Sequence, residues 1–234
     1  MTQLKTTILS IAILASVSLS GCSKEKNKEV TEEDAVEIIE ASLKENSAGL
    51  SETVTKYTEA LMGEFINDNC SQNYDTTYNF SYLGALIESN YTITWGYVLS
   101  CSNGLPSTIN LNVTTQGTYS TNRVSSDDNS NTDFTITGLL PSATSLTYNG
   151  DITRSGSQTI TINSNTREIT STINLSVSEL SVNKTSYEIE SGTAVATLSA
   201  NNGSETFSFS GDIIFNGNGS ATFTINGNSY TITM

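Results

Sequence analysis

The feature that most constrains the fold is an alternation of apolar and polar residues that begins at Tyr74 and continues to the C-terminus. Successive side chains of a β-strand point to opposite faces, so this pattern is typical of strands with one buried face. Only Pro106 and Pro141 interrupt the region, and Asn226-Gly227 is a strong hairpin signal. We expect a mainly β fold: an antiparallel meander of about eleven strands that forms a sandwich or a strongly curved sheet.

Residues 31–69, which precede the strands, show helical spacing instead. Thr31 can cap a helix whose first turn holds three acids, and a break over Asn46–Gly49 separates it from a second helix that ends near Asn67–Asn69. We expect this helical pair to pack on the sheet, although its apolar stripes could instead dock a partner or plug a ligand cavity. The stripes are Val36, Ile39 and Leu43, then Val54, Tyr57, Leu61 and Phe65.

The predicted β domain, residues 70–234, contains degenerate repeats at offsets of 61–64 residues. The shared offset favours a duplication, in which a meander grows one sheet by adding hairpins. The repeated segments are Ser107–Val113 with Ser171–Val177, Gly150–Ile152 with Gly211–Ile213, and 157–170 with 220–233.

The N-terminus has the pattern of an export signal. Lys5 precedes an apolar run over Ile8–Val17, which is too short to span a membrane, and Leu19-Ser20-Gly21-Cys22 follows. This motif resembles the lipobox of bacterial lipoproteins. The resemblance implies that residues 1–21 are removed, that Cys22 carries a diacylglyceryl group and an N-acyl chain such as palmitate, and that 22–30 is a charged tether. The alternative is an ordinary secretory signal with an incidental cysteine.

The charge of the chain limits its partners. Cleavage before Cys22 removes Lys5 and no acid, so 9 basic and 24 acidic residues remain, a net charge of −15. This balance argues against nucleic acid and against an anionic membrane surface as partners. The expected membrane contact is therefore the lipid on Cys22, and the expected location is the bacterial envelope, at the outer membrane, on either side.

The other two cysteines, Cys70 and Cys101, are predicted to form a disulfide, since an exported protein is in an oxidising compartment. A hairpin that pairs Tyr82 near Tyr91 would bring the two cysteines close together. Two free thiols are the alternative.

Catalysis has few candidate residues in this sequence. The chain contains no histidine, which removes histidine-based triads, histidine-ligated zinc and the usual general base at neutral pH. We therefore expect no enzyme activity, and a two-carboxylate glycosidase is the formal alternative. The acids of the β region are expected to sit singly in turns or on polar faces: Asp133, Asp151, Glu168, Glu179 and Asp212.

Two segments are weaker candidates for binding sites. Asp127, Asn129, Asn131 and Asp133 alternate like the oxygen ligands of a calcium loop, but Thr132 and Gly138 replace the expected glycine and glutamate, so a solvated hairpin loop is the alternative. An aromatic surface for sugars or peptides is the second candidate, against ordinary core packing. Its residues are Tyr74, Tyr78, Tyr82, Tyr91, Trp95 and Tyr97.

Together these patterns predict a lipid-anchored envelope protein that is a non-catalytic binding or structural module. One alternative is a carrier of an apolar ligand with an open-barrel fold, and another is a surface glycan-binding or adhesion module. A carrier needs an unfilled apolar cavity, whereas a binding module has a packed interior.

Overall fold

The computed structural model describes residues 29–65, 70, 73–162 and 165–234. Within them, a single antiparallel sheet of ten strands follows the order of the chain, so the predicted meander is confirmed with one strand fewer than the pattern indicated. The strands are β1 (Asn73–Leu83), β2 (Ile87–Ser102), β3 (Leu105–Thr121), β4 (Val124–Thr137), β5 (Ser145–Ile162), β6 (Asn165–Asn183), β7 (Ile189–Asn201), β8 (Thr206–Gly217), β9 (Ser220–Ile225) and β10 (Asn228–Thr233).

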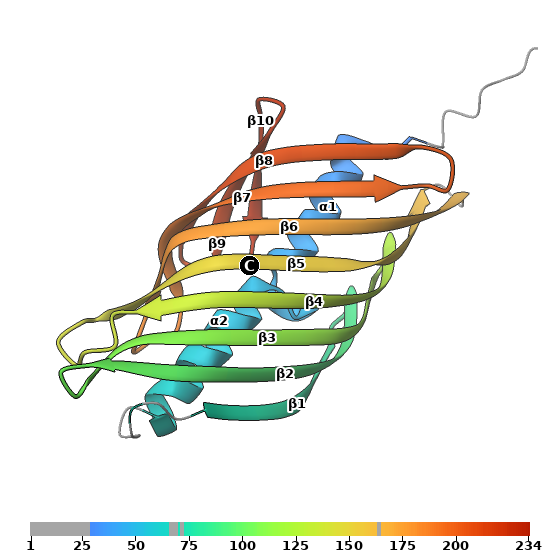
Figure 1. Ribbon diagram of the computed structural model, residues 1–234. Coiled ribbons are helices and arrows are strands. Elements are labelled where there is room, and N and C mark those ends of the chain that lie inside the picture. The colour runs from blue at the N-terminus through green and yellow to red at the C-terminus, as the bar shows by residue number, and fades with distance from the viewer. Residues whose placement is uncertain (1–28, 66–69, 71–72, 163–164) are drawn as a thin grey trace, which may run out of the picture.

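The predicted helical pair lies on one face of the curved sheet (Figure 1). It consists of α1 (Glu32–Leu43) and α2 (Leu50–Ala60), joined through a 3-10 turn, η1 (Glu45–Ser47), and followed by a π turn, η2 (Leu61–Phe65). Thr31 caps α1 as expected, because its hydroxyl accepts from the backbone N–H of Asp34 while the Asp34 carboxylate accepts from the backbone N–H of Thr31. The predicted end at Asn67–Asn69 lies outside the described residues.

The helices and the inner face of the sheet form one hydrophobic core. The first turn of α1 also holds the sheet through polar contacts. Asp34 pairs with Arg123 at 3.3 Å and with Arg167 at 2.7 Å, and Glu32 accepts a 2.7 Å hydrogen bond from Tyr230 of the last strand. The sheet therefore curls far enough around the helices for β10 to contact α1.

The β1–β2 hairpin brings the two cysteines together, in a register two residues away from the predicted one. Tyr82 lies opposite Ser89 rather than near Tyr91. Continued to the start of the hairpin, the observed register places Cys70 opposite Cys101, and the two form a disulfide with Cα atoms 5.6 Å apart. The predicted pairing is confirmed.

The repeated segments are not all shifted by the same number of strands. Ser107–Val113 lies in β3 and its counterpart lies three strands later in β6. The first half of β5 likewise matches β8, three strands later, but the second half matches β9, four strands later. The long strand β5 therefore corresponds to two shorter strands near the C-terminus.

Candidate functional site

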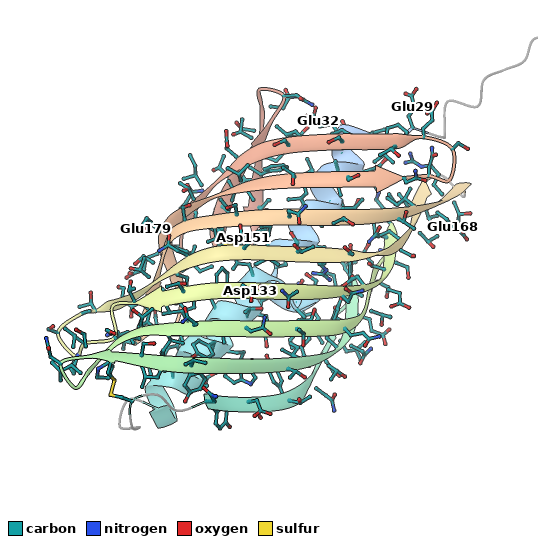
Figure 2. The ribbon with its side chains drawn as sticks, viewed as in Figure 1. Glu29, Glu32, Asp133, Asp151, Glu168 and Glu179 are labelled. Carbon is teal, nitrogen blue, oxygen red and sulfur yellow. A yellow bond between two sulfur atoms is a disulfide. The ribbon has the colours of Figure 1, made fainter. Side chains whose placement is uncertain are left out.

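The face of the sheet that points away from the helices, hereafter the outer face, is polar. Along most strands, buried residues alternate with exposed ones, most of which are serine, threonine, asparagine or aspartate, and Figure 2 shows side chains over this face. Short polar side chains in neighbouring strands lie opposite one another and can bond across the strands, as Thr77 and Thr94 do at 2.8 Å. The face thus presents rows of hydrogen-bond donors and acceptors in a fixed array.

A hollow of about 680 Å³ crosses β1 to β5 on this face, and we call it the outer groove. Its floor includes a row of direct cross-strand partners: Asp75, Gly96, Asn112, Asp133 and Asp151. Gly96 carries no side chain, which leaves open the space between its two polar neighbours in the row. The other polar lining residues are Asn73, Asn110, Thr135 and Asn149.

The polar groups of the outer groove are partly oriented by one another. Asn112 Nδ2 donates to Asp133 Oδ1 at 2.8 Å, and Asn131 Nδ2 donates to Asp133 Oδ2 at 2.8 Å. Asp133 and Asp151 are direct partners on adjacent strands (Figure 2), so the expectation that the acids sit singly is wrong for this pair. Amides and carboxylates side by side can accept hydrogen bonds from the hydroxyl groups of a polyol, and the amides can also donate hydrogen bonds to them.

The predicted calcium ligands do not lie in a loop. Asp127, Asn129, Asn131 and Asp133 lie within β4, at alternate exposed positions of one strand, so neither the calcium loop nor the solvated hairpin loop forms there. At about 3.4 Å per residue, roughly 20 Å separates the first from the last, too far for one coordination shell. Among the residues that the structure describes, no group of three or more acidic, cysteine or histidine side chains is arranged to hold a metal ion.

The aromatic residues of the first hairpin belong mainly to the core. Tyr91 and Tyr97 are buried, and Trp95 packs edge-on against Tyr57 of α2 with ring centroids 4.9 Å apart. The ring of Tyr78 in turn packs edge-on against Trp95, with ring centroids 6.3 Å apart. Of the six predicted surface aromatics, only Tyr74 and Tyr82 are exposed. Four of the six therefore pack inward. All six share the inner phase of β1 and β2, but Tyr74 and Tyr82 lie at the two ends of β1 and are left exposed.

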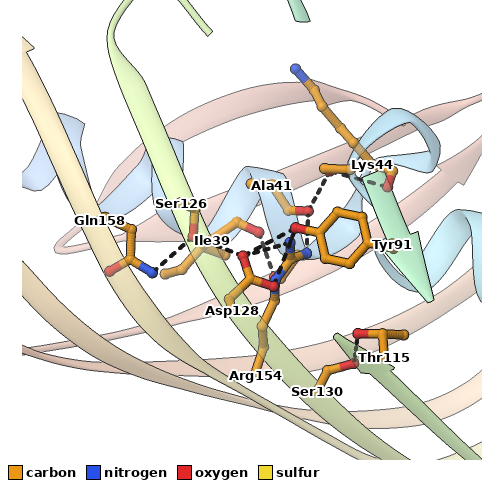
Figure 3. Close-up of polar contacts among 12 residues, drawn as sticks. Ile39, Ala41, Lys44, Tyr91, Thr115, Ser126, Asp128, Ser130, Arg154 and Gln158 are labelled. Atoms are coloured by element: carbon orange, nitrogen blue, oxygen red, sulfur yellow. Dashed lines mark hydrogen bonds and ion pairs between the residues drawn. The ribbon is translucent and has the colours of Figure 1, made fainter. Parts of the chain in front are cut away.

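A buried ionic network lies beneath α1, and the sequence reasoning missed it (Figure 3). Arg154 Nε and Nη2 donate to the two oxygens of Asp128 at 2.9 and 3.0 Å, while Nη1 donates to the backbone oxygen of Ala41 at 3.0 Å. Tyr91 accepts from Arg154 Nη2 at 2.5 Å. Burial has the largest single effect on the pKa of Arg154 and lowers it, but Asp128, Tyr91 and Tyr119 together raise it more, so the pKa lies above its ordinary value.

Two glycines make room for this network. Gly117 and Gly156 are the cross-strand partners of Asp128, and a Cβ atom at Gly156 would lie 2.4 Å from that of Asp128. The sequence signal was present, since Asp128 and Arg154 both fall in the inner phase of their strands. Opposite charges on a buried face predict an ion pair, because an unpaired charge there is too costly.

Glu52 of α2 is a second buried acid that the sequence reasoning missed. The residue is 1 % exposed, and neither carboxyl oxygen has a hydrogen-bond partner among the residues that the structure describes. Burial raises the pKa of the Glu52 carboxyl to about 7; Lys56 opposes this shift, Glu45 and Glu59 add to it, and the nearby Tyr78 hydroxyl opposes it slightly. The group sits behind the first hairpin and does not line the outer groove.

The lipobox and Cys22 lie outside the described residues. In the part of the chain that is described, no helix is long and apolar enough to cross a membrane. Comparisons of the chain with protein-family models, with curated proteins and with solved structures found no match.

Proposed function

We propose that the protein is a lipid-anchored envelope protein that binds a polyhydroxylated ligand, such as a glycan, in the outer groove without chemical turnover. The observation that carries the proposal is the contrast between the two faces of the sheet. The inner face packs against α1 and α2 in one hydrophobic core, whereas the outer face has a hollow whose polar lining residues are mainly carboxylates and amides. Anchoring at Cys22 rests on the lipobox resemblance.

The packed interior also distinguishes this proposal from the apolar carrier. Among the pockets found in the described residues, the small apolar one between the end of α2 and the sheet, beside Leu61, Leu99 and Leu139, has a volume of only about 20 Å³. A carrier of this shape would have to move its helices off the sheet. Mass spectrometry of native protein tests the carrier alternative. A stoichiometric co-purified lipid, beyond the acyl groups on Cys22, would favour a carrier.

The binding proposal is tested by measuring glycan binding on an array, followed by titration of any bound sugar. Asn112→Ala should weaken binding about tenfold, because it removes a donor and releases Asp133. The matched control is Asn174→Ala, an exposed asparagine of β6 that lies outside the outer groove and bonds Thr153 on the same sheet. Equal effects of the two substitutions would contradict the assignment of the site.

The Asp133–Asp151 pair makes a glycosidase the second candidate, since paired carboxylates are the catalytic groups of that reaction. We expect no turnover, because both oxygens of Asp133 accept amide hydrogen bonds in an open groove. A panel of glycoside, ester and peptide substrates checks this. Reproducible hydrolysis that both Asp133→Asn and Asp151→Asn abolish would establish the enzyme instead.

A further inference from the structure

The tip of the β1–β2 hairpin exposes large apolar side chains. Leu83 is 83 % exposed, Leu86 is 67 % exposed and Tyr82 is 42 % exposed. No charged residue occurs from Tyr82 to Ile87, and the backbone N–H of Gly84 donates to the Ile87 oxygen at 2.8 Å, which closes the turn. Single exposed leucines are ordinary on a protein surface, but two on one ordered turn form a compact apolar projection.

This tip lies at the same end of the molecule as the start of α1 (Figure 1). Ile87 pairs with Thr121, and the turn that follows carries Arg123, which pairs with Asp34 in the first turn of α1. Ile87 and Glu33 also line one groove of about 400 Å³ between α1 and the sheet. The tip is therefore close to the point from which the chain continues toward Cys22.

The length of that connection limits how far this end can lie from a membrane. Glu29 lies seven positions after Cys22, and an extended chain spans at most about 3.6 Å per position, or about 25 Å in total. The opposite end of the sheet exposes Leu105 and Leu140. It lies at the far end of strands of up to 19 residues, roughly 60 Å away.

We infer that the hairpin tip, Tyr82–Ile87, inserts Leu83 and Leu86 into the headgroup region of the membrane that holds the lipid on Cys22. This inference rests on the proposed lipid anchor. The anchor keeps the tip at a high local concentration near the bilayer, so a small apolar contact suffices to orient the domain. Glu88 and the acids of α1 flank the tip, so the contact is apolar and favours zwitterionic over anionic lipid.

The consequence is a fixed orientation of the whole domain. With the tip in the headgroups, the strands point away from the bilayer and the outer groove stands clear of the membrane surface. The end that bears Leu105 and Leu140 then faces away from the lipid.

The test uses the full acylated protein in zwitterionic vesicles whose acyl chains carry a nitroxide quencher. One added cysteine, at Leu86 or at Leu140, is labelled with a polarity-sensitive fluorophore while the native disulfide stays intact. We expect a blue shift and a loss of emission to the quencher at position 86, and neither at position 140. Mass spectrometry of the N-terminal peptide reports acylation in the same samples.

The outcomes separate the inference from the proposal on which it depends. If Cys22 carries no lipid, the lipid anchor and this inference both fail. If Cys22 is acylated but position 86 behaves like position 140, the inference alone fails. A blue shift at position 86 without quenching also overturns it, because a protein partner or a second copy then covers the tip.

A second measurement places the label at Ala85, an exposed residue of the turn. Leu83→Ser with Leu86→Ser should abolish the quenching at position 85, whereas the matched pair Leu105→Ser with Leu140→Ser should leave it unchanged. All four leucines are more than 40 % exposed, so neither pair should disturb folding. Loss of quenching in both pairs, or in neither, would contradict the inference.

Discussion

At the scale of single residues, the molecule places ionisable groups inside a β core that is otherwise built from alternating apolar side chains. Asp128 and Arg154 satisfy each other, and Arg154 also bonds the backbone oxygen of Ala41 near the end of α1. The pair therefore joins two strands to a helix. A buried charge that keeps its partners is tolerated, whereas one that loses them is strongly destabilising.

We predict that Asp128→Asn lowers the free energy of unfolding by about 3–5 kcal/mol, because it leaves the Arg154 charge buried and unpaired. Urea denaturation measures the change. Asp127→Asn is the control, since Asp127 is the exposed neighbour on the same strand and should change stability by less than about 0.5 kcal/mol. Equal effects at the two positions would contradict a structural role for the network.

The raised pKa of Glu52 predicts that the protein becomes less stable as the pH rises. Its pKa is about 7 in the folded protein against an ordinary value of 4.5. The folded state therefore holds this proton more tightly, and stability falls as pH rises from 4.5 to 7. Glu52→Gln should match the natural protein at pH 4 and exceed it by roughly 3 kcal/mol at pH 8.

The measurement for Glu52 is chemical denaturation of both proteins across that pH range. Hydrogen bonds lower the pKa values of two other carboxyl groups, chiefly the bond from Asn226 to Glu32 and the bond from Asn183 to Glu190. Both groups titrate in both proteins, so their effects on stability cancel in the comparison. A difference between the two proteins that stays constant with pH would show that the carboxyl is not the cause.

At the scale of elements, the β1–β2 hairpin is held at its open end and along its inner face. Its open end is closed by the disulfide between Cys70 and Cys101, and its inner face packs on α2 through Trp95 and Tyr57. As an edge strand, β1 has one hydrogen-bonded neighbour, β2. The covalent bond compensates for the pairing that an edge strand lacks.

Replacing both cysteines with alanine should lower the free energy of unfolding by about 3–4 kcal/mol, on the loop-entropy argument for a separation of 31 residues. Thermal or urea denaturation detects this loss. Alkylation of the natural protein without reductant should label neither thiol. Quantitative labelling of either one would show that the bond does not form in the mature protein.

At the scale of the whole molecule, the sheet closes around the two helices and is fastened to them at the start of α1. Asp34 and Glu32 there contact the β3–β4 turn, β6 and β10. A lipid on Cys22 would therefore hold the domain by the end at which α1 is bonded to three parts of the sheet.

Cys22→Ser should release the protein from the membrane fraction, because the diacylglyceryl group can be attached only through the sulfur atom. Fractionation of cells and labelling with a radioactive fatty acid check this outcome. A double replacement of Leu105 and Leu140 by serine is the control, and it should remain in the membrane fraction. A Cys22→Ser variant that fractionates and labels like the natural protein would contradict the lipid anchor.

The amino-acid pattern alone predicts the helical pair, the strands and which face of the strands is buried. The alternation from Tyr74 onward, the cap at Thr31 and the break at Asn46–Gly49 each depend on neighbouring residues, so they can be read without knowing the fold. The pairing of Cys70 with Cys101 was also predictable, since the compartment and the hairpin both favoured it.

Which side chains meet depends on how the strands pair in the folded protein. A register shift of two residues leaves every side chain on the same face but changes all of its partners, as the β1–β2 hairpin shows. The Asp133–Asp151 pair, the Asp128–Arg154 ion pair and the outer groove all depend on that register across several strands. Because a period of two specifies the face and not the partner, these sites could not be derived from the alternation alone.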